Sequence, residues 1–322
     1  MSNLIDTDLK YQSSQLIIKP TVACNFNCSF CSAKKLDIPL HNKVPQILKD
    51  YILNLRPTNV IITGGEPLMN PRSYFEDLIS ILDSTKVDYT LSLTSNLVLW
   101  YNDPEKWDWL FNRENVGIDT SFQYGSGRKD DQVYTEERFK KVFYSFYERY
   151  NKKLDFIYVV SSENEKYAIK AVELAKELDC WAKLNCQIPV GNATEYYPRY
   201  KLLDIYLQLI KLGLDQYESN LYNRKHHFCP FTKTYKYCEL NKAVYVNSKD
   251  ELIEGNCEES LSSEGKLLIG KSALSPKCYA CKLFNVCNGC SVNRKCTEPI
   301  KEDHCKWMRN HYNELLENNL IY

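Results

Sequence analysis

The feature that most constrains this chain is the distribution of its 14 cysteines among 322 residues. Three fall between Cys24 and Cys31, none lies between residues 32 and 179, and nine fall between Cys229 and Cys305. The first residues carry neither the basic nor the apolar segment of a secretory signal, so we expect a cytoplasmic protein. Because disulfides are rare in that reducing compartment, these clusters indicate metal or iron–sulfur ligands.

Composition argues against two classes of partner. The chain has 41 basic and 41 acidic residues, and nucleic-acid binding needs a basic excess that this balance does not provide. No apolar run approaches the roughly 18 residues that cross a bilayer, so we expect no membrane partner. The length suggests about two domains, ample for a sizeable core.

Short apolar runs alternate with amphipathic segments through the first 190 residues, which predicts βαβ units and a parallel sheet. A full or partial (β/α) barrel and an open doubly wound sheet both fit this pattern. In each of them the chemistry lies at the carboxyl ends of the strands. The six predicted strands are 16–19, 59–63, 89–93, 116–121, 156–160 and 182–187.

The rest of the chain has a different pattern. The segment from Cys229 to Cys305 shows little apolar periodicity, so bound metal would have to hold it together. A closing helix is expected from about Lys306 to Glu317. We therefore predict a barrel over residues 1–195, a helical linker over 196–228, and a cysteine-rich domain with its closing helix over 229–322.

The first cysteine cluster, Cys24-Asn-Phe-Asn-Cys28-Ser-Phe-Cys31, directly follows the first predicted strand. A cubane [4Fe–4S] cluster normally takes four thiolates, and only three are gathered here. Three thiolates would leave one iron open, which is typical of a reactive rather than a structural metal site. Part of a zinc site and inert buried thiols are the alternatives.

A glycine-rich turn, Gly64-Gly65-Glu66-Pro67, ends the second predicted strand. The glycines let the backbone approach a ligand closely, and Pro67 restricts the turn. Backbone carbonyls and the Glu66 carboxylate at this edge suit an ammonium group, although such a run can also be only a tight turn.

Together the two motifs resemble the radical SAM superfamily, which has C-x3-C-x2-C after the first strand and Gly-Gly-Glu-Pro after the second. The resemblance implies a partial (β/α)6 barrel. It also implies an enzyme that reductively cleaves S-adenosylmethionine (SAM) to a 5′-deoxyadenosyl radical, which abstracts hydrogen from a substrate. Cys24, Cys28 and Cys31 would hold the cluster, whose open iron binds the amino and carboxylate groups of SAM.

The same resemblance implies which residues contact SAM. The turn from Gly64 to Pro67 would hold the amino group, and Phe30, just before the third cysteine, would lie against the adenine. Further candidates stand at later strand ends: Ser95, Asn96, Ser121 and Val190.

The C-terminal cysteines resemble a SPASM domain, which binds two auxiliary [4Fe–4S] clusters. By position, one cluster would use Cys229, Cys238, Cys257 and Cys290, and the other Cys278, Cys281, Cys287 and Cys305. The match is imperfect: eighteen residues separate Cys238 from Cys257, and two rather than three separate Cys287 from Cys290.

One cysteine of this set, Cys296, is left over. It could replace Cys290 as a ligand, donate hydrogen to a substrate radical as the one candidate catalytic residue, or have no role. Cys229 is an alternative non-ligand. Taken alone, the run from Cys278 to Cys290 also suits a zinc ribbon.

Most SPASM proteins act on peptides or proteins, so the resemblance implies maturation of a ribosomal peptide by crosslinking, oxidation or epimerisation. The alternatives are a dehydrogenase or epimerase of a small metabolite such as a sugar derivative, and a non-catalytic protein with zinc or iron–sulfur centres. About 15 residues precede the first strand, so recognition of a peptide leader would need a separate protein or direct docking. The expected cofactors are three [4Fe–4S] clusters and SAM, with flavodoxin or ferredoxin as electron donor.

Overall fold

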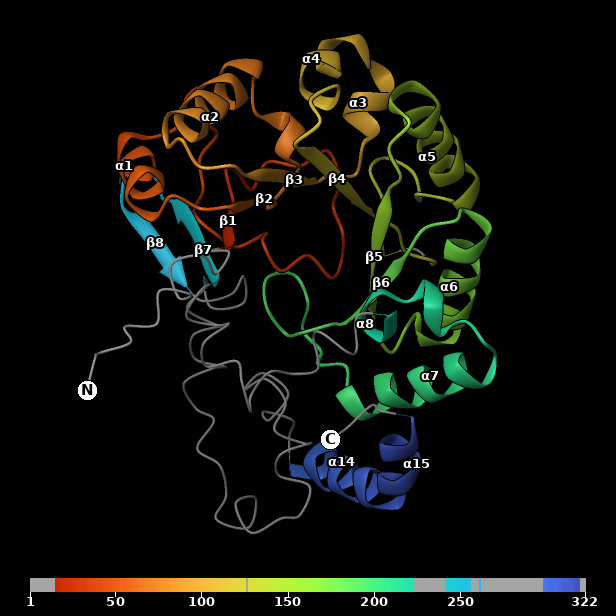
Figure 1. Cartoon of the computed structure of the whole chain (residues 1–322). Coiled ribbons are helices and arrows are strands. Elements are labelled where there is room, and N and C mark those ends of the chain that lie inside the picture. The colour runs from red at the N-terminus through yellow and green to blue at the C-terminus, as the bar shows by residue number, and fades with distance from the viewer. Residues whose placement is uncertain (1–14, 126, 223–240, 256–260, 262–297, 319–322) are drawn as a thin grey trace, which may run out of the picture.

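A computed structural model of the chain describes residues 15–125, 127–222, 241–255, 261 and 298–318. Within these residues eight strands form one sheet in the order β6-β5-β4-β3-β2-β1-β7-β8. Figure 1 shows this sheet as an open arc with helices along its outer side. The prediction of a partial (β/α) barrel is confirmed, and neither a closed barrel nor a doubly wound sheet describes it.

The first six strands are parallel and follow sequence order across the sheet. Each end lies within one residue of the predicted strand. The strands are β1 (Gln15–Ile18), β2 (Asn59–Ile62), β3 (Thr90–Thr94), β4 (Val116–Ser121), β5 (Asp155–Val160) and β6 (Ala182–Cys186).

Helices connect these strands. The longest, α5, begins after Thr135, whose hydroxyl accepts a hydrogen bond from the Arg138 N–H at 3.2 Å, as an N-cap should. It ends at Asn151, which adopts the left-handed conformation at φ 52°. The helices of the barrel are α1 (Gln46–Leu55), α2 (Arg72–Ser84), α3 (Val98–Asn102), α4 (Asp108–Phe111), α5 (Glu136–Tyr150) and α6 (Ala168–Glu177).

Alternation along the strands gives the sheet two different faces, because successive side chains point to opposite sides. On β4 and β5 the helix-facing side chains include Ile118 and Tyr158, which are buried. The intervening side chains, among them Asp119 and Ser121, are half-buried on the concave side. The concave face of the sheet therefore carries polar side chains on β4.

A hairpin from the cysteine-rich part extends the sheet. Strand β7 (Asn241–Val246) pairs in parallel with β1, and β8 (Leu252–Gly255) pairs antiparallel with β7. Ser248 in the hairpin turn donates a hydrogen bond to the Asp37 carboxylate at 2.6 Å, and Ile38 packs in a small apolar cluster with the hairpin. The loop that follows the first three cysteines thus rests on this hairpin.

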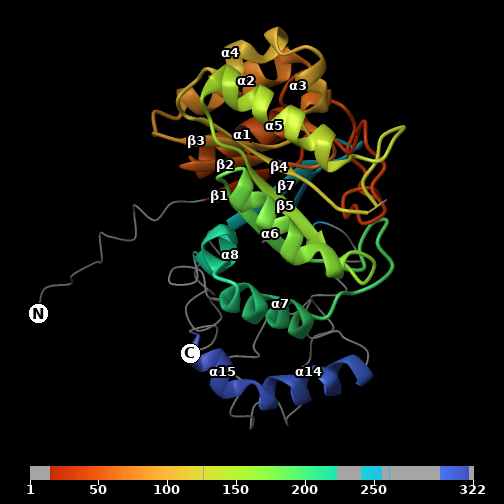
Figure 2. The same ribbon diagram turned by 90° about the vertical axis from the view of Figure 1, so that its right-hand side faces the viewer.

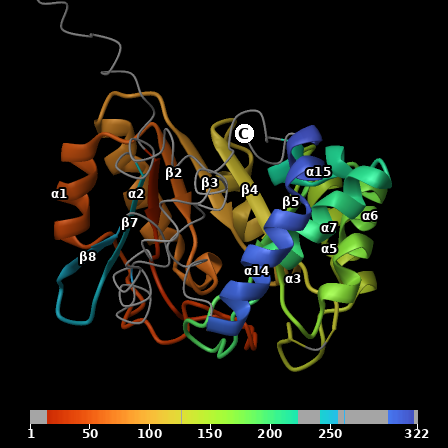
Figure 3. The ribbon, with the colours of Figure 1, turned by 90° about the horizontal axis from the view of Figure 1, so that it is seen from below.

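Four further helices follow β6 along the chain. Helices α7 and α8 pack against β6, where the Asn220 Nδ2 donates a hydrogen bond to the Leu184 carbonyl at 3.1 Å. Helices α14 and α15 run beside α7 (Figures 2 and 3), with an ion pair of 2.8 Å between Lys211 and Glu314. The single closing helix predicted from Lys306 is wrong at its start, because α14 begins eight residues earlier and the helix is interrupted at His311. No described helix is both long and apolar enough to cross a membrane. These helices are α7 (Arg199–Lys211), α8 (Ser219–Tyr222), α14 (Glu298–Asn310) and α15 (Tyr312–Glu317).

Candidate functional site

The three N-terminal cysteines lie in the loop after β1, at the carboxyl edge of the sheet. Cys28 is buried, whereas Cys24 and Cys31 are half-buried. The Cys24 Sγ accepts a hydrogen bond from the Phe26 N–H at 3.3 Å. Burial raises the pKa of Cys24 to about 11 and also raises the pKa of Cys28. Thiols buried in this way need a metal or a basic neighbour if they are to be held as thiolates.

The Gly-Gly-Glu-Pro turn is joined to this loop through its backbone. The Gly65 N–H donates to the Thr21 carbonyl at 2.8 Å, and the Glu66 N–H donates to the Ala23 carbonyl at the same distance. A Cβ on Gly65 would lie 2.2 Å from the Ala23 oxygen. Gly64, at φ 133°, would bring a Cβ within 2.8 Å of the Thr21 oxygen. Contact with the cysteine loop itself therefore requires both glycines.

The Glu66 carboxylate points into the protein and is 1% exposed. It accepts hydrogen bonds from the Ser95 hydroxyl at 2.7 Å, the Asn96 N–H at 2.8 Å and the Leu68 N–H at 3.0 Å. Burial raises its pKa, and these donors oppose the rise. The sequence suggests this side chain for an ammonium group, but its oxygens join the ends of β2 and β3. The two preceding glycine carbonyls accept no hydrogen bond from the described chain and can serve that group instead.

Ser95 and Asn96, at the end of β3, are both buried. The Ser95 hydroxyl also accepts a hydrogen bond from the Leu97 N–H at 2.9 Å. The Asn96 side chain pairs with that of Asn25 in the cysteine loop, donating from its Nδ2 to the Asn25 Oδ1 at 2.7 Å. Both residues therefore hold the loop and the strand ends together, and their contact with SAM stays a prediction.

The segment after β6 also contacts the cysteine loop. Val190, the predicted SAM contact, is 2% exposed, and Ser121 at the end of β4 is half-buried. Gly191 adopts φ 70°, and a Cβ there would lie 2.3 Å from the Cys31 carbonyl oxygen. The Asn192 N–H donates to that same carbonyl at 2.9 Å. The SAM contacts predicted for Val190 and Ser121 stay predictions, and Gly191 and Asn192 bring the segment after β6 against the cysteine loop.

A carboxyl group on the concave side has an unusual environment. Asp119 on β4 is paired in register with Asp155 on β5. Burial and the charge of Asp155 raise the pKa of Asp119 to about 6, and Lys183 opposes this rise. At neutral pH the concave face of the sheet therefore carries a partly desolvated carboxylate.

Sequence reasoning missed the loop after β4, which closes over the cysteines. The Lys129 carbonyl accepts a hydrogen bond from the Asn27 N–H at 2.8 Å. The Gly127 carbonyl accepts one from the Ser29 N–H at 2.9 Å. The signal that could have found this loop is a glycine followed by two basic residues shortly after a strand end.

Arg128 lies between those two contacts and is 6% exposed. Its Nη1 is 4.0 Å from the Cys28 Sγ. The guanidinium carbon lies 4.9 Å from the ring centre of Phe26 and 5.6 Å from that of Tyr134. The positive charge lowers the pKa of Cys28, against the larger effect of burial.

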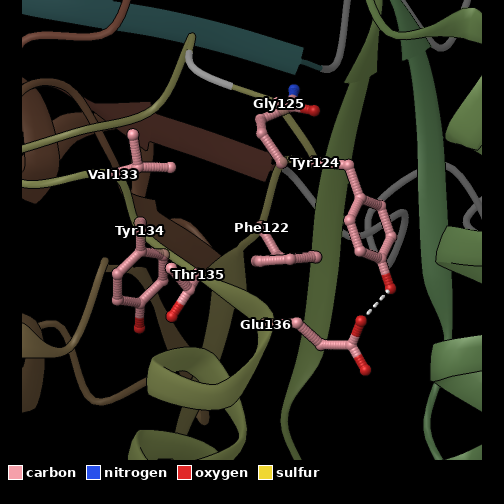
Figure 4. Close-up of a pocket in the computed structure, with 8 residues that line it drawn as sticks. Phe122, Tyr124, Gly125, Val133, Tyr134, Thr135 and Glu136 are labelled. Atoms are coloured by element: carbon pink, nitrogen blue, oxygen red, sulfur yellow. Dashed lines mark hydrogen bonds between the residues drawn. The ribbon is translucent and has the colours of Figure 1, made fainter.

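Two hollows flank residues 123–125. The first, of about 170 Å³, opens beside Phe30 of the cysteine loop. The second, of about 330 Å³, lies at the start of α5, where the Tyr124 hydroxyl donates to the Glu136 carboxylate at 2.9 Å (Figure 4). The larger pocket is lined by no residue of the cysteine loop, so the smaller pocket is the one that adjoins the cysteines. Side chains around the first include Phe30, Gln123, Tyr124, Lys166, Tyr167 and Gln187.

The donor set fits a cluster better than a single ion. Nowhere in the described residues do three His, Cys, Asp or Glu side chains converge as one metal ion requires. In a cubane each thiolate binds a different iron, so three cysteines around one loop with a buried cation beside them suit that larger group. Cys305 is half-buried in α14. The other predicted auxiliary ligands and Cys296 lie outside the described residues: Cys229, Cys238, Cys257, Cys278, Cys281, Cys287 and Cys290.

The model of the radical SAM superfamily matches residues 18–175. The fold is similar to histidine-tagged anSMEcpe with bound AdoMet, at 16% identity over 97% of this chain and 100% of that one, with a TM-score of 0.66. Native anSMEcpe with bound AdoMet and the Cp18Cys peptide is 16% identical over 95% of this chain and 98% of that one, with a TM-score of 0.67. Streptococcus suis SuiB bound to precursor peptide SuiA is 16% identical over 87% of this chain and 72% of that one, with a TM-score of 0.56. No curated protein matches the sequence.

Proposed function

This chain belongs to the radical SAM superfamily, and we propose that Cys24, Cys28 and Cys31 hold its [4Fe–4S] cluster and that its substrate is a peptide or protein. The cluster with bound SAM supplies a 5′-deoxyadenosyl radical, which takes a hydrogen atom from the substrate. The observation that carries the proposal is the cysteine loop itself. Backbone hydrogen bonds join that loop to the segments that follow β2, β4 and β6.

The chain's own residues would orient SAM in this site. The carbonyls of Gly64 and Gly65 can accept hydrogen bonds from its ammonium group. The pocket beside Phe30 has aromatic and amide side chains, which suit a flat, polar base such as adenine. Ser121 and Val190 are proposed as further contacts, whereas Ser95 and Asn96 act mainly by keeping the strand ends in place.

A peptide substrate is supported by two observations. Similar structures include anSMEcpe with the Cp18Cys peptide and SuiB with the precursor peptide SuiA. The concave face of the sheet presents the Asp119 carboxylate and the Ser121 hydroxyl on β4, which could bind peptide amides or a basic side chain. A separate leader-binding protein and a flavodoxin or ferredoxin as electron donor complete the proposal. A small polar metabolite is the alternative substrate.

Two auxiliary clusters are proposed for the cysteine-rich part, with the ligand sets given above. Strand β7 begins three residues after Cys238, and β8 ends two residues before Cys257. Ala243 pairs with Gly255, so the chain enters and leaves this hairpin at the same end. That geometry supports a shared cluster for Cys238 and Cys257. The domain boundaries at residues 195 and 228 remain a proposal. The hairpin belongs to the third proposed domain, and its strand β7 pairs with β1 of the first.

The test is SAM cleavage by the anaerobically reconstituted full chain under dithionite, with 5′-deoxyadenosine measured by chromatography. We expect Cys28→Ala to lower its formation at least 100-fold, because one cluster ligand is lost. Cys180→Ala is the matched control, since Cys180 is also a buried cysteine but lies just before β6, away from the loop. It should retain activity within about twofold. Equal activity of the Cys28 variant and the wild type would overturn the assignment.

The substrate class needs a second experiment. Short peptides encoded beside this gene are incubated with the enzyme, SAM and reductant in deuterated water, and the products are weighed. Loss of two hydrogen atoms indicates a crosslink or oxidation, and gain of solvent deuterium alone indicates epimerisation. Abundant 5′-deoxyadenosine with unchanged peptides, together with a modified small metabolite, would favour the alternative.

A further inference from the structure

Arg128 is a buried cation without an acidic partner. No carboxylate in the described part of the chain forms an ion pair with it, and its buried Nε has no hydrogen-bond partner there. Among the described residues, its guanidinium contacts the Cys28 sulfur at 4.0 Å and the rings of Phe26 and Tyr134. An arginine side chain is effectively always charged in proteins.

A buried charge that lacks a counter-ion is strongly destabilising. The two rings offer a cation–π attraction, which does not replace an anion. Glu66 is near enough for the charge of Arg128 to lower its pKa, but no ion pair or hydrogen bond joins the two, and the Glu66 oxygens accept hydrogen bonds from three other donors. The Cys28 sulfur, as a cluster thiolate, is the negative group in direct contact with the Arg128 guanidinium.

We propose that Arg128 is the counter-ion of the cluster, acting through the Cys28 thiolate, and that it raises the cluster's reduction potential. This inference rests on the proposed cluster at Cys24, Cys28 and Cys31. Reduction adds one negative charge to the cluster, so a fixed positive charge in contact with a ligand sulfur stabilises the reduced form more than the oxidised form. Net charge and hydrogen bonds to sulfur are the levers by which proteins set such potentials.

The surroundings of Arg128 make this effect strong. The backbone carbonyls on either side, those of Gly127 and Lys129, are bonded to the cysteine loop, which keeps the side chain in place. The rings of Phe26 and Tyr134 and the low exposure of Arg128 exclude water. Coulomb interactions are weakly screened in such an environment. Arg128 is thus a positioning residue that makes the electron transfer preceding SAM cleavage easier.

Arg138 provides a matched control. Its guanidinium also lies over the Tyr134 ring, at 5.4 Å. In contrast to Arg128, it is paired with the Asp130 carboxylate at 2.6 Å, and a third of its side chain is exposed. Replacing Arg138 therefore removes an arginine from the same aromatic ring without removing the charge beside Cys28.

The test is a redox titration of the full chain without SAM, monitored by electron paramagnetic resonance. The signal followed is the one absent when Cys24, Cys28 and Cys31 are all changed to Ala. We expect Arg128→Met to lower the equilibrium constant for reduction about tenfold, which is ~59 mV for one electron. Arg138→Met should leave the potential unchanged, and Arg128→Lys should fall between Arg128→Met and the wild type.

Each other outcome also decides the question. An unchanged potential in Arg128→Met overturns the inference, and weaker SAM binding in that variant would then make Arg128 a ligand of the SAM carboxylate. If Arg128→Met loses the signal but Arg128→Lys keeps it, the requirement for a positive charge is supported. If both variants lose the signal, the role of Arg128 is in packing, and the inference is overturned. If the wild type has no signal that depends on the three cysteines, the proposed function fails, whatever Arg128 does.

Discussion

The two halves of the sheet's carboxyl edge differ in how their buried polar groups are satisfied. At the ends of β2 and β3, Glu66, Ser95 and Asn96 complete one another's hydrogen bonds within the protein. Beside β4, the Nε of Arg128 and the hydroxyl of Tyr134 are buried with no partner among the described residues. The polar groups of Glu66, Ser95 and Asn96 are thus bonded to one another, whereas the Arg128 Nε and the Tyr134 hydroxyl are not bonded to any described residue.

This difference distinguishes residues that hold the site together from residues that face a bound group. Fully bonded polar networks make a structure rigid, and buried polar groups without partners need an explanation such as a bound ligand. By this criterion the Glu66 side chain holds the strand ends together, and its contact with SAM stays a prediction. Arg128 belongs to neither of the two sequence motifs, and we propose that it faces the cluster.

The largest effect on stability is expected where the framework touches the cysteine loop. Gly191→Ala places a methyl group 2.3 Å from the Cys31 carbonyl oxygen at a positive φ, and should lower the free energy of unfolding by about 2–4 kcal/mol. Gly213 has a similar φ of 65° with open space around it, so Gly213→Ala should cost only about 1 kcal/mol. Urea unfolding and iron content of both variants measure the difference. Equal losses would show that the loop contact is unimportant.

A smaller effect is expected within the hydrogen-bond network. Glu66→Gln replaces one acceptor oxygen by an NH2 group that faces donors, which should lower the free energy of unfolding by about 1–3 kcal/mol. The control is Glu173→Gln, on the exposed face of α6, which should change it by less than about 0.5 kcal/mol. If Glu66→Gln is as stable as the wild type but binds SAM more weakly, Glu66 contacts the ligand after all.

The smallest expected effect is a gain in the free energy of unfolding. The pKa of Asp119 in the folded protein, about 6, lies above its ordinary 3.8, so the folded state binds the proton more tightly than the unfolded state. Stability therefore falls as the pH rises from about 4 through 6, and the full penalty persists above that range. Asp119→Asn should add about 1–2 kcal/mol at pH 8, since partial solvent contact reduces the effect, and almost nothing at pH 4. Urea unfolding at both pH values checks this, and a gain independent of pH would contradict the assignment.

The sequence predicted the six parallel strands closely because short apolar runs and glycine turns are local signals. It could not predict that β7 lies beside β1, since more than 200 residues separate Ile18 from Asn241 and the pairing depends on the tertiary fold. The closing helix was expected too short for a related reason. Its first turns carry few apolar residues to mark them.

In the site, the sequence placed Cys24, Cys28 and Cys31 directly after the first strand, and the structure has them together in the loop that follows β1. Their role as cluster ligands stays a prediction. The inward direction of Glu66 depends on donors from β3, which no local pattern reveals. Arg128 was missed for the same reason, because its closeness to Cys28 follows from how the loop after β4 folds back.

The most direct test of the account is the iron and sulfide content of the full chain and of a variant with Cys24, Cys28 and Cys31 all changed to Ala, both reconstituted anaerobically. We expect the variant to hold about four irons and four sulfides fewer per chain than the wild type, and to retain about eight of each in its auxiliary clusters. Equal contents in the two proteins, or zinc in place of iron at these cysteines, would contradict it.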